Sequence, residues 1–90
     1  MELHITGKNV EITDWLQQYV EKKVGRLDRY LPDIQEARVE LTTQNSRRAG
    51  DRQVAQVTLR SNGSILRAEE KSDDMFASID AVVDKINRSA

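Results

Sequence analysis

The chain has 90 residues, enough for one small domain with a single thin hydrophobic core. With 38% hydrophobic and 32% charged residues, its composition is typical of a folded protein and excludes the disordered class. The formal net charge of -1, from 14 cations and 15 anions, excludes a uniformly basic surface. Any affinity for nucleic acid must therefore come from segregation of charge within the fold. Cysteine is absent, which excludes disulfides and thiolate chemistry.

Targeting and membrane signals are not evident in the sequence. The first residues, MELHITGKNV, have no basic stretch followed by an apolar run, as a secretory signal would. No apolar run approaches the roughly 20 residues that cross a membrane. We therefore expect one soluble, cytoplasmic domain over residues 1–90.

The first predicted elements are a strand and a helix. Apolar and polar side chains alternate over residues 2–6, which predicts a short strand. Thr13 is a good N-cap, because its hydroxyl can accept a hydrogen bond from an unpaired backbone N–H. From there, apolar side chains recur at spacings of three and four as far as Pro32, which predicts a helix over 14–31. This apolar stripe consists of Leu16, Val20, Val24, Leu27 and Leu31.

Three more strands are expected after this helix. Alternating patterns predict them over 37–43, 54–60 and 65–70. The dipeptide Asn62-Gly63 between the last two strands is the strongest hairpin signal in the chain. It favours a type I′ turn, in which both central residues have positive φ.

A second helix is expected to close the chain, capped by Ser72 or Asp73. Its apolar stripe is formed by Met75, Ile79, Val82, Val83 and Ile86, with Phe76 alongside. The order β-α-β-β-β-α predicts an α+β fold, with one four-stranded mixed sheet and two helices packed on one face. The first helix must join parallel strands by a right-handed crossover, and the other strands form an antiparallel meander.

Cationic side chains gather on one flank of the first predicted helix, beside its apolar stripe. They are Lys22, Arg26 and Arg29, with Lys23 closer to the core edge. Trp15 and Tyr19 fall on the same flank. Long basic side chains reach phosphates, and aromatic faces stack on bases, so this pattern is suited to nucleic-acid binding.

Structural explanations of the same charges are more common than nucleic-acid binding. Cations on helices are commonly just solvated. If the two helices run parallel, the cationic flank of the first could also face Asp80 and Asp84 of the last and form ion pairs. On the last helix, Lys85 lies on one flank and Arg88 near the outer face, where cations also complement the helix dipole. Periodicity alone does not decide among these interpretations.

Catalytic and metal-binding chemistry has little support. His4 is the only histidine, on the solvent face of a predicted strand, with no serine or cysteine arranged beside it in sequence. The acids Asp73, Asp74, Asp80 and Asp84 could suggest Mg²⁺, but helix capping and solubility account for them. Arginines 47, 48 and 52 either touch a phosphate backbone or keep a polar loop soluble. We predict no enzyme, no metal site and no cofactor.

Three segments together resemble a known family. The segments ITGKNVEIT (5–13), KVGRLDRYLP (23–32) and DDMFASIDAVVDKINR (73–88) are similar to the ribosome hibernation-promoting factors, also called ribosome-associated inhibitor A or protein Y. The most specific part is the Asp-Met-aromatic-x-x-Ile-Asp pattern at 74–80, followed by Asp84 and Lys85. The resemblance covers nearly the whole chain and is weakest over 44–53.

The resemblance implies a translation inhibitor that acts by occupancy. Family members bind the small ribosomal (30S) subunit between head and body, in the path of mRNA and of the A- and P-site tRNAs, during stress or stationary phase. It also implies which side chains contact rRNA: Lys23, Arg26 and Arg29 on the first helix, and Lys85 and Arg88 on the last. Lys22 is predicted to contact rRNA with them because it shares the flank of Arg26 and Arg29, not because family members carry a cation at this position. Long members add a C-terminal domain that pairs ribosomes, so dimerisation is expected only if the full-length protein has one.

The alternative function is a small protein-interaction module that uses a sheet edge or a helix flank and has no role with RNA. Neither of these two functions requires a membrane or a small-molecule substrate. The two differ in their response to salt, because phosphate contacts release counterions and weaken steeply as salt rises.

Overall fold

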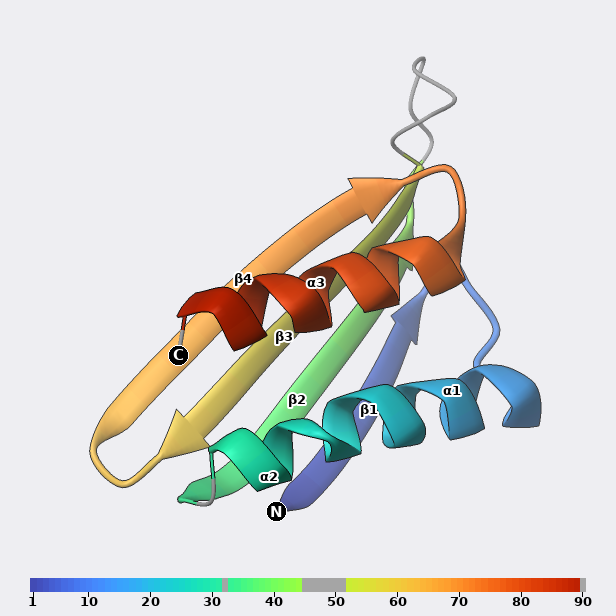
Figure 1. Ribbon diagram of the computed structural model, residues 1–90. Coiled ribbons are helices and arrows are strands. Elements are labelled where there is room, and N and C mark those ends of the chain that lie inside the picture. Colours follow the sequence, from blue (N-terminus) through green and yellow to red (C-terminus); the bar gives the residue numbers. More distant parts are fainter. Residues whose placement is uncertain (32, 45–51, 90) are drawn as a thin grey trace.

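The computed structural model describes residues 1–31, 33–44 and 52–89 (Figure 1). Its elements are β1 (Glu2–Lys8), α1 (Asp14–Gly25), α2 (Leu27–Tyr30), β2 (Ile34–Thr43), β3 (Gln53–Ser61), β4 (Ser64–Ser72) and α3 (Met75–Ser89). This order confirms the predicted α+β fold. Pro32, Arg47 and Arg48, which entered the sequence predictions, lie outside the described residues.

The four strands form one mixed sheet in the order β1-β2-β3-β4. The strands β1 and β2 are parallel, and both β2–β3 and β3–β4 are antiparallel. In Figure 1, α1 and α2 cross over β1 and β2, while α3 lies over β3 and β4 on the same face. The helical layer therefore covers one face of the sheet and leaves the other open.

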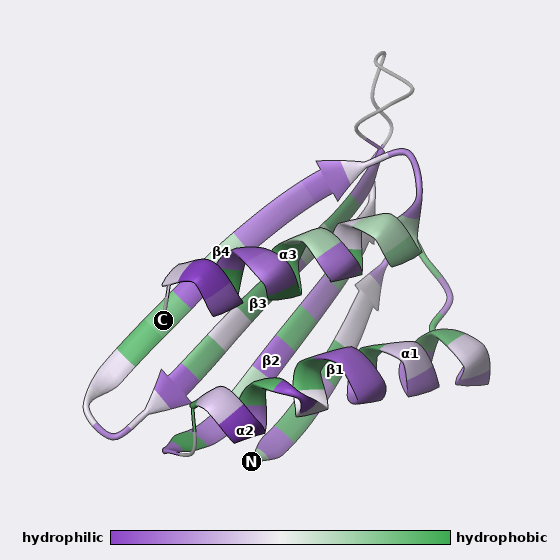
Figure 2. Cartoon of the chain, in the orientation of Figure 1, coloured by the Kyte–Doolittle hydropathy of each residue, from purple (hydrophilic) through white to green (hydrophobic). Residues whose placement is uncertain are grey.

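The core lies between the helical layer and the covered face of the sheet. Figure 2 shows hydrophobic and hydrophilic residues alternating along β2 and β3, as expected for strands with one buried face. The fully buried members with large side chains are Val20, Val24 and Leu27 of the first helical segments, Val39, Leu41 and Val57 of the sheet, and Ile79, Val82 and Ile86 of α3. The edge strand β4 contributes only partly buried residues, Leu66 and Ala68.

The first helix begins as predicted and is divided near its end. Thr13 is its N-cap, and the Thr13 hydroxyl accepts the backbone N–H of Leu16 at 3.1 Å. The predicted helix over 14–31 is interrupted after Gly25, because glycine is a weak helix former in a helix interior. Arg26 keeps helical dihedral angles (φ -65°, ψ -25°). The interruption therefore leaves the apolar stripe and the cationic side continuous across it.

α3 is capped by Asp74, and the prediction of Ser72 or Asp73 was wrong. The Asp74 Oδ1 accepts the backbone N–H of Phe76 at 3.0 Å, and the Asp74 carbonyl accepts the N–H of Ser78. The Ser72 hydroxyl instead accepts the N–H of Asp74 at 3.2 Å, within the turn that leads into the helix. A serine two residues upstream thus supports the cap without being the cap.

The β3–β4 hairpin turns at Asn62-Gly63, as predicted, but the turn is not of type I′. Ser61 pairs with Ser64, which leaves two residues in the turn. Gly63 has a φ of 80°, and Asn62 has no positive φ. Type I′ needs positive φ at both positions, so the conformational demand falls on the glycine alone.

A polar contact joins α1 to α3, which run parallel and side by side (Figure 1). The Tyr19 hydroxyl donates a hydrogen bond to Asp80 Oδ1 at 2.7 Å, and the Tyr19 ring meets the edge of Phe76 with centroids 4.9 Å apart. Lys23 Nζ lies 3.3 Å from the same Asp80 oxygen and 5.5 Å from the centre of the Tyr19 ring. We call this set of residues the Tyr19–Asp80 contact. Bonding to the carboxylate, together with desolvation, raises the pKa of Tyr19 to about 12.

Replacing the α3 cap should weaken the whole fold, because α3 carries a large part of the core. We expect Asp74→Ala to lower the free energy of unfolding by about 0.5–2 kcal/mol in urea denaturation. The matched control is Asp73→Ala, since Asp73 is exposed and its side chain makes no hydrogen bond to a described residue. Equal losses in the two variants would contradict the assignment of Asp74 as the cap.

The Tyr19–Asp80 contact should give stability a signature at high pH. The folded pKa of Tyr19 lies above its ordinary value of 10.0, so the stabilisation is complete below pH 10 and is lost as pH rises toward 12. We expect Tyr19→Phe to lose about 0.5–1.5 kcal/mol at neutral pH and to lack this alkaline step in denaturation curves. Tyr30→Phe, which alters an exposed ring, should keep the step. Ionisation of Tyr19 near pH 10 in an absorbance titration would refute this account.

Candidate nucleic-acid interface

The outer side of the first helical segment presents three unpaired cations. Lys22, Arg26 and Arg29 are all exposed, and none makes an ion pair or a side-chain hydrogen bond with another described residue. We call these three side chains the cationic flank. Trp15, 71% exposed, lies on the same side about two turns upstream of Lys22. Lys22, Arg26, Arg29 and Trp15 thus lie on one side of the first segment, as the helical wheel predicted, and their side chains are exposed to solvent.

Lys23 is a different case, because it faces α3. Its side chain is only 25% exposed and pairs with Asp80 at 3.3 Å. The ion pairing between helices that the sequence left open is therefore realised at this one position of the first segment. Ion pairs near the surface contribute only about 0–1 kcal/mol, so a competing anion could displace Asp80 at small cost.

The two predicted cations of α3 are also paired, and they point in different directions. Lys85 Nζ lies 3.8 Å from Glu70 and donates to the carbonyl oxygen of Glu69 at 3.4 Å. Lys85 therefore faces β4, on the side of α3 away from the first helix. Arg88 pairs with Asp84 one turn earlier on the same helix. Both side chains remain more than half exposed, but the structure does not bring Lys85 together with the cationic flank.

The aromatic residues differ from the sequence prediction. Tyr19 was expected on the cationic flank, but it turns toward α3 and contacts Phe76 and Asp80. Sequence reasoning missed Tyr30, which is 64% exposed at the end of α2. Its helical position could have revealed it, because Tyr19, Lys23 and Tyr30 fall on one stripe at spacings of four and seven.

A groove runs between the two helical segments. One wall is formed by Lys23, Arg26, Leu27 and Tyr30 of the first segment, and the other by Asp80, Val83, Asp84 and Asn87 of α3. Cations thus line one wall and carboxylates the other. We call this feature the interhelical groove.

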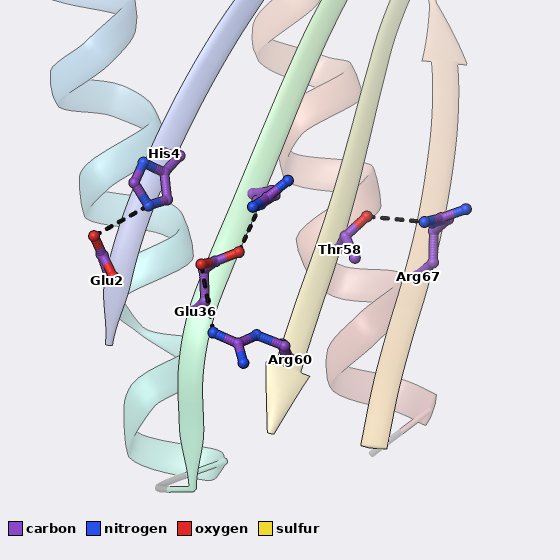
Figure 3. Close-up of polar contacts among 7 residues, drawn as sticks. Glu2, His4, Glu36, Thr58, Arg60 and Arg67 are labelled. Carbon is purple, nitrogen blue, oxygen red and sulfur yellow. Dashed lines mark hydrogen bonds and ion pairs between the residues drawn. The ribbon is translucent and has the colours of Figure 1, made fainter. Parts of the chain in front are cut away.

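The open face of the sheet carries charges that neutralise one another (Figure 3). Glu36 accepts a hydrogen bond from Arg38 Nε at 2.6 Å and pairs with Arg60 at 3.5 Å. The bond from Arg38, helped by the charges of both arginines, holds the pKa of Glu36 below its ordinary value. Arg67 donates to the Thr58 hydroxyl at 3.3 Å. Because acids and bases alternate across these strands, this face lacks the charge segregation of the cationic flank.

Candidate metal ligands have other partners in the part of the chain that the structure describes. Glu2, His4 and Glu36 bring one ligand atom each to within 4.8 Å of one another on the open face. The two arginines bonded to Glu36 oppose a further cation at this position. On α3, Asp80 and Asp84 are bonded to cations, and Asp74 is the helix cap.

None of the helices within residues 1–31, 33–44 and 52–89 has the length and apolarity to cross a membrane.

Comparisons with known proteins agree with the fold and with the sequence resemblance. A family model described as Sigma 54 modulation protein / S30EA ribosomal protein matches residues 3–90. The ribosome hibernation promotion factor of Deinococcus radiodurans is 44% identical over 84 residues, which are 93% of this chain and 44% of that protein. The ribosome hibernation promoting factor of Escherichia coli K12 is 36% identical over 88 residues, which are 98% of this chain and 87% of that protein. This chain therefore spans less than half of the first relative and most of the second.

Two solved structures share the architecture. The N-terminal domain of Thermus thermophilus Protein Y superposes with a TM-score of 0.84 and 34% identity, over 99% of this chain and 94% of that chain. A ribosomal subunit interface protein from Coxiella burnetii gives a TM-score of 0.86 over 99% of this chain and 92% of that chain, and at 22% identity it shows the fold alone. The relatives are named as hibernation factors and not as enzymes, which agrees with the prediction of a non-catalytic chain. The chain belongs to the Sigma 54 modulation protein / S30EA ribosomal protein family, the family of the ribosome hibernation promoting factors and protein Y.

Proposed function

We propose that this domain binds rRNA of the small ribosomal subunit, between head and body, and blocks mRNA and A- and P-site tRNA by occupancy. Family membership supports the hibernation role. The assignment of the surface depends on one observation, the three exposed and unpaired cations of the cationic flank. In a chain of net charge -1, such a cluster gives a local positive field that the whole-chain charge conceals.

Phosphates are the ligands that this flank fits best. Arg26 and Arg29 carry guanidinium groups, which bind phosphate oxygens by two parallel hydrogen bonds, and Lys22 adds a point charge. Phosphate contacts fix the position of a protein on a nucleic acid without reading its sequence. The flank is thus a positioning surface for a structured RNA.

Lys23, Lys85 and Arg88 take a secondary part in this proposal. Each is paired with a surface carboxylate in the free protein. Because such pairs are worth about 0–1 kcal/mol, an rRNA phosphate can replace the carboxylate when the domain docks. These three cations therefore exchange partners when the RNA binds, whereas the side chains of the cationic flank have no ion pair with a described residue to break.

The proposed inhibition is steric and involves no chemical step. The described residues form a body of 39 × 26 × 18 Å, stiffened by a four-stranded sheet behind the helices. A body of this size, fixed by its helical layer, excludes other ligands from the cleft it fills. Occupancy by a rigid domain is consistent with the non-enzymatic character of the family.

A protein-interaction module remains the second candidate, since β1 and β4 are edge strands of the sheet. An edge strand presents unpaired backbone groups to which another chain can add a strand. Binding of this kind depends little on salt and should not depend on Arg26 or Arg29.

Removing charge from the flank should weaken binding to isolated small subunits. We expect Arg26→Ala/Arg29→Ala to lose at least about 1.5 kcal/mol of binding free energy, because hydrogen bonds to charged groups are lost. The slope of log affinity against log salt should become shallower by roughly 0.7–0.9 for each phosphate contact removed. Co-sedimentation at a series of salt concentrations measures both quantities.

The matched control removes two arginines from the opposite face. Arg60→Ala/Arg67→Ala makes the same change of net charge on the open face of the sheet. We expect this variant to bind small subunits with nearly the affinity and salt slope of the original chain. Equal losses in both double variants would show that only net charge matters, and an unaffected Arg26→Ala/Arg29→Ala would exclude the proposed surface.

A further inference from the structure

We infer that the interhelical groove is a binding site for one unpaired nucleobase, which stacks on Tyr30 while its phosphate contacts Arg26 and its polar edge contacts α3. This inference rests on the proposed function, because RNA is the partner that supplies the base. The proposed surface contacts phosphates, and this inference adds to it a subsite that recognises a base.

The groove has the size and floor of a site for a flat ring. Its volume is about 250 Å³, below the roughly 300 Å³ at which sites for larger ligands begin. Val83, half-buried, provides an apolar floor. The Tyr30 ring stands at one end with 64% of its surface exposed. An exposed aromatic face beside an apolar floor is the usual platform for base stacking.

The charges of the groove exclude a site for phosphate alone. Asp80 and Asp84 line the α3 wall and would repel an anion placed between the walls. A nucleotide avoids this conflict, because its negative phosphate and its base edge are at opposite ends. With the phosphate on Arg26, the amino group of the base points toward the carboxylates, which accept hydrogen bonds from such groups.

Polar atoms on both walls remain available for a ligand. Arg26 and the Asn87 amide make no side-chain hydrogen bond to another described residue. Asp84 binds Arg88 through Oδ2, and no described residue bonds its Oδ1. The Asp80 oxygen that receives Tyr19 and Lys23 is already occupied. Asp84 and Asn87 are therefore the edge-reading pair of this groove.

The chemistry of this pair sets a preference among bases. A carboxylate accepts from the amino group of cytosine, adenine or guanine, and an asparagine amide can bond the Watson–Crick edge of adenine by accepting from its amino group and donating to N1. Uracil has no amino group and offers the Asp84 acceptor only its ring N3–H, which lies between two carbonyl oxygens that a carboxylate repels. The groove should therefore prefer amino-bearing bases. It admits them only from single-stranded loops or bulges, because bases in a helix keep this edge paired.

Chemical probing of small subunits tests the inference directly. Dimethyl sulfate modifies unpaired adenine and cytosine on the edge that the groove would cover. We expect the original chain at saturation to protect at least one such base. Tyr30→Ala, compared at equal occupancy by co-sedimentation, should restore its reactivity. Tyr30→Ala should also weaken binding about tenfold with an unchanged salt slope, because stacking and not charge is lost. Tyr30→Phe, which keeps the ring, should behave as the original chain does.

A second variant keeps the test decisive if Tyr30→Ala is poorly folded. Asn87→Ala alters an exposed amide on the opposite wall and should lift the same protection. Protections that persist in a folded variant of each wall, or no base protection at all by the original chain, would overturn the nucleobase site. The proposed function would still stand if Arg26→Ala/Arg29→Ala then weakened binding. If that variant bound normally, both proposals would fail.

Discussion

The contact between Tyr19 and Asp80 determines how the helical layer presents its charges. It holds α1 and α3 parallel and in register, with the Tyr19 ring against Phe76 and Lys23 over the same carboxylate. Its energy is modest, but it decides which side chains point between the helices and which point out. A helix rotated by one residue would carry each side chain about 100° around the axis. Lys23 would then be free and Lys22 would be displaced from the outer side.

Charge is therefore sorted in layers across this small protein. On the open face of the sheet, Glu36 pairs with both Arg38 and Arg60 and offsets part of their charge. Between the helices, acids and cations face each other across a groove. On the outer side of the first helical segment, three neighbouring cations stand without an acid bonded to any of them among the described residues. Under the proposed function, an approaching polyanion is attracted to the helical layer, which orients the domain with its sheet away from the proposed RNA partner.

Much of this fold could be predicted from patterns of period two and period 3.6, because each strand and helix has one apolar face. The places where prediction failed depend on local hydrogen bonding or on tertiary contact. Before α3, the Ser72 hydroxyl accepts the N–H of Asp74 and the Asp74 carboxylate accepts the N–H of Phe76, and only the geometry of the turn identifies Asp74 as the cap. Likewise, the helical wheel placed Tyr19 beside the cations. Tyr19 also lies close to the apolar stripe around the helix axis, so its side chain can reach α3 and bond Asp80. The location of Lys85 against β4 required the packing of α3 on the sheet.

The same physics explains why the surface proposed to bind a polyanion can contain acids. A continuous sheet of cations would hold phosphates in many positions with similar energy and would repel itself in the free protein. Carboxylates at Asp80 and Asp84 divide the positive surface and fix Lys23 and Arg88 through weak pairs, while the cationic flank has no ion pair with a described residue. Where an acid faces a cation across the groove, the favoured ligand is negative at one end and donates hydrogen bonds at the other. A nucleotide has both properties, and a bare phosphate has only the first.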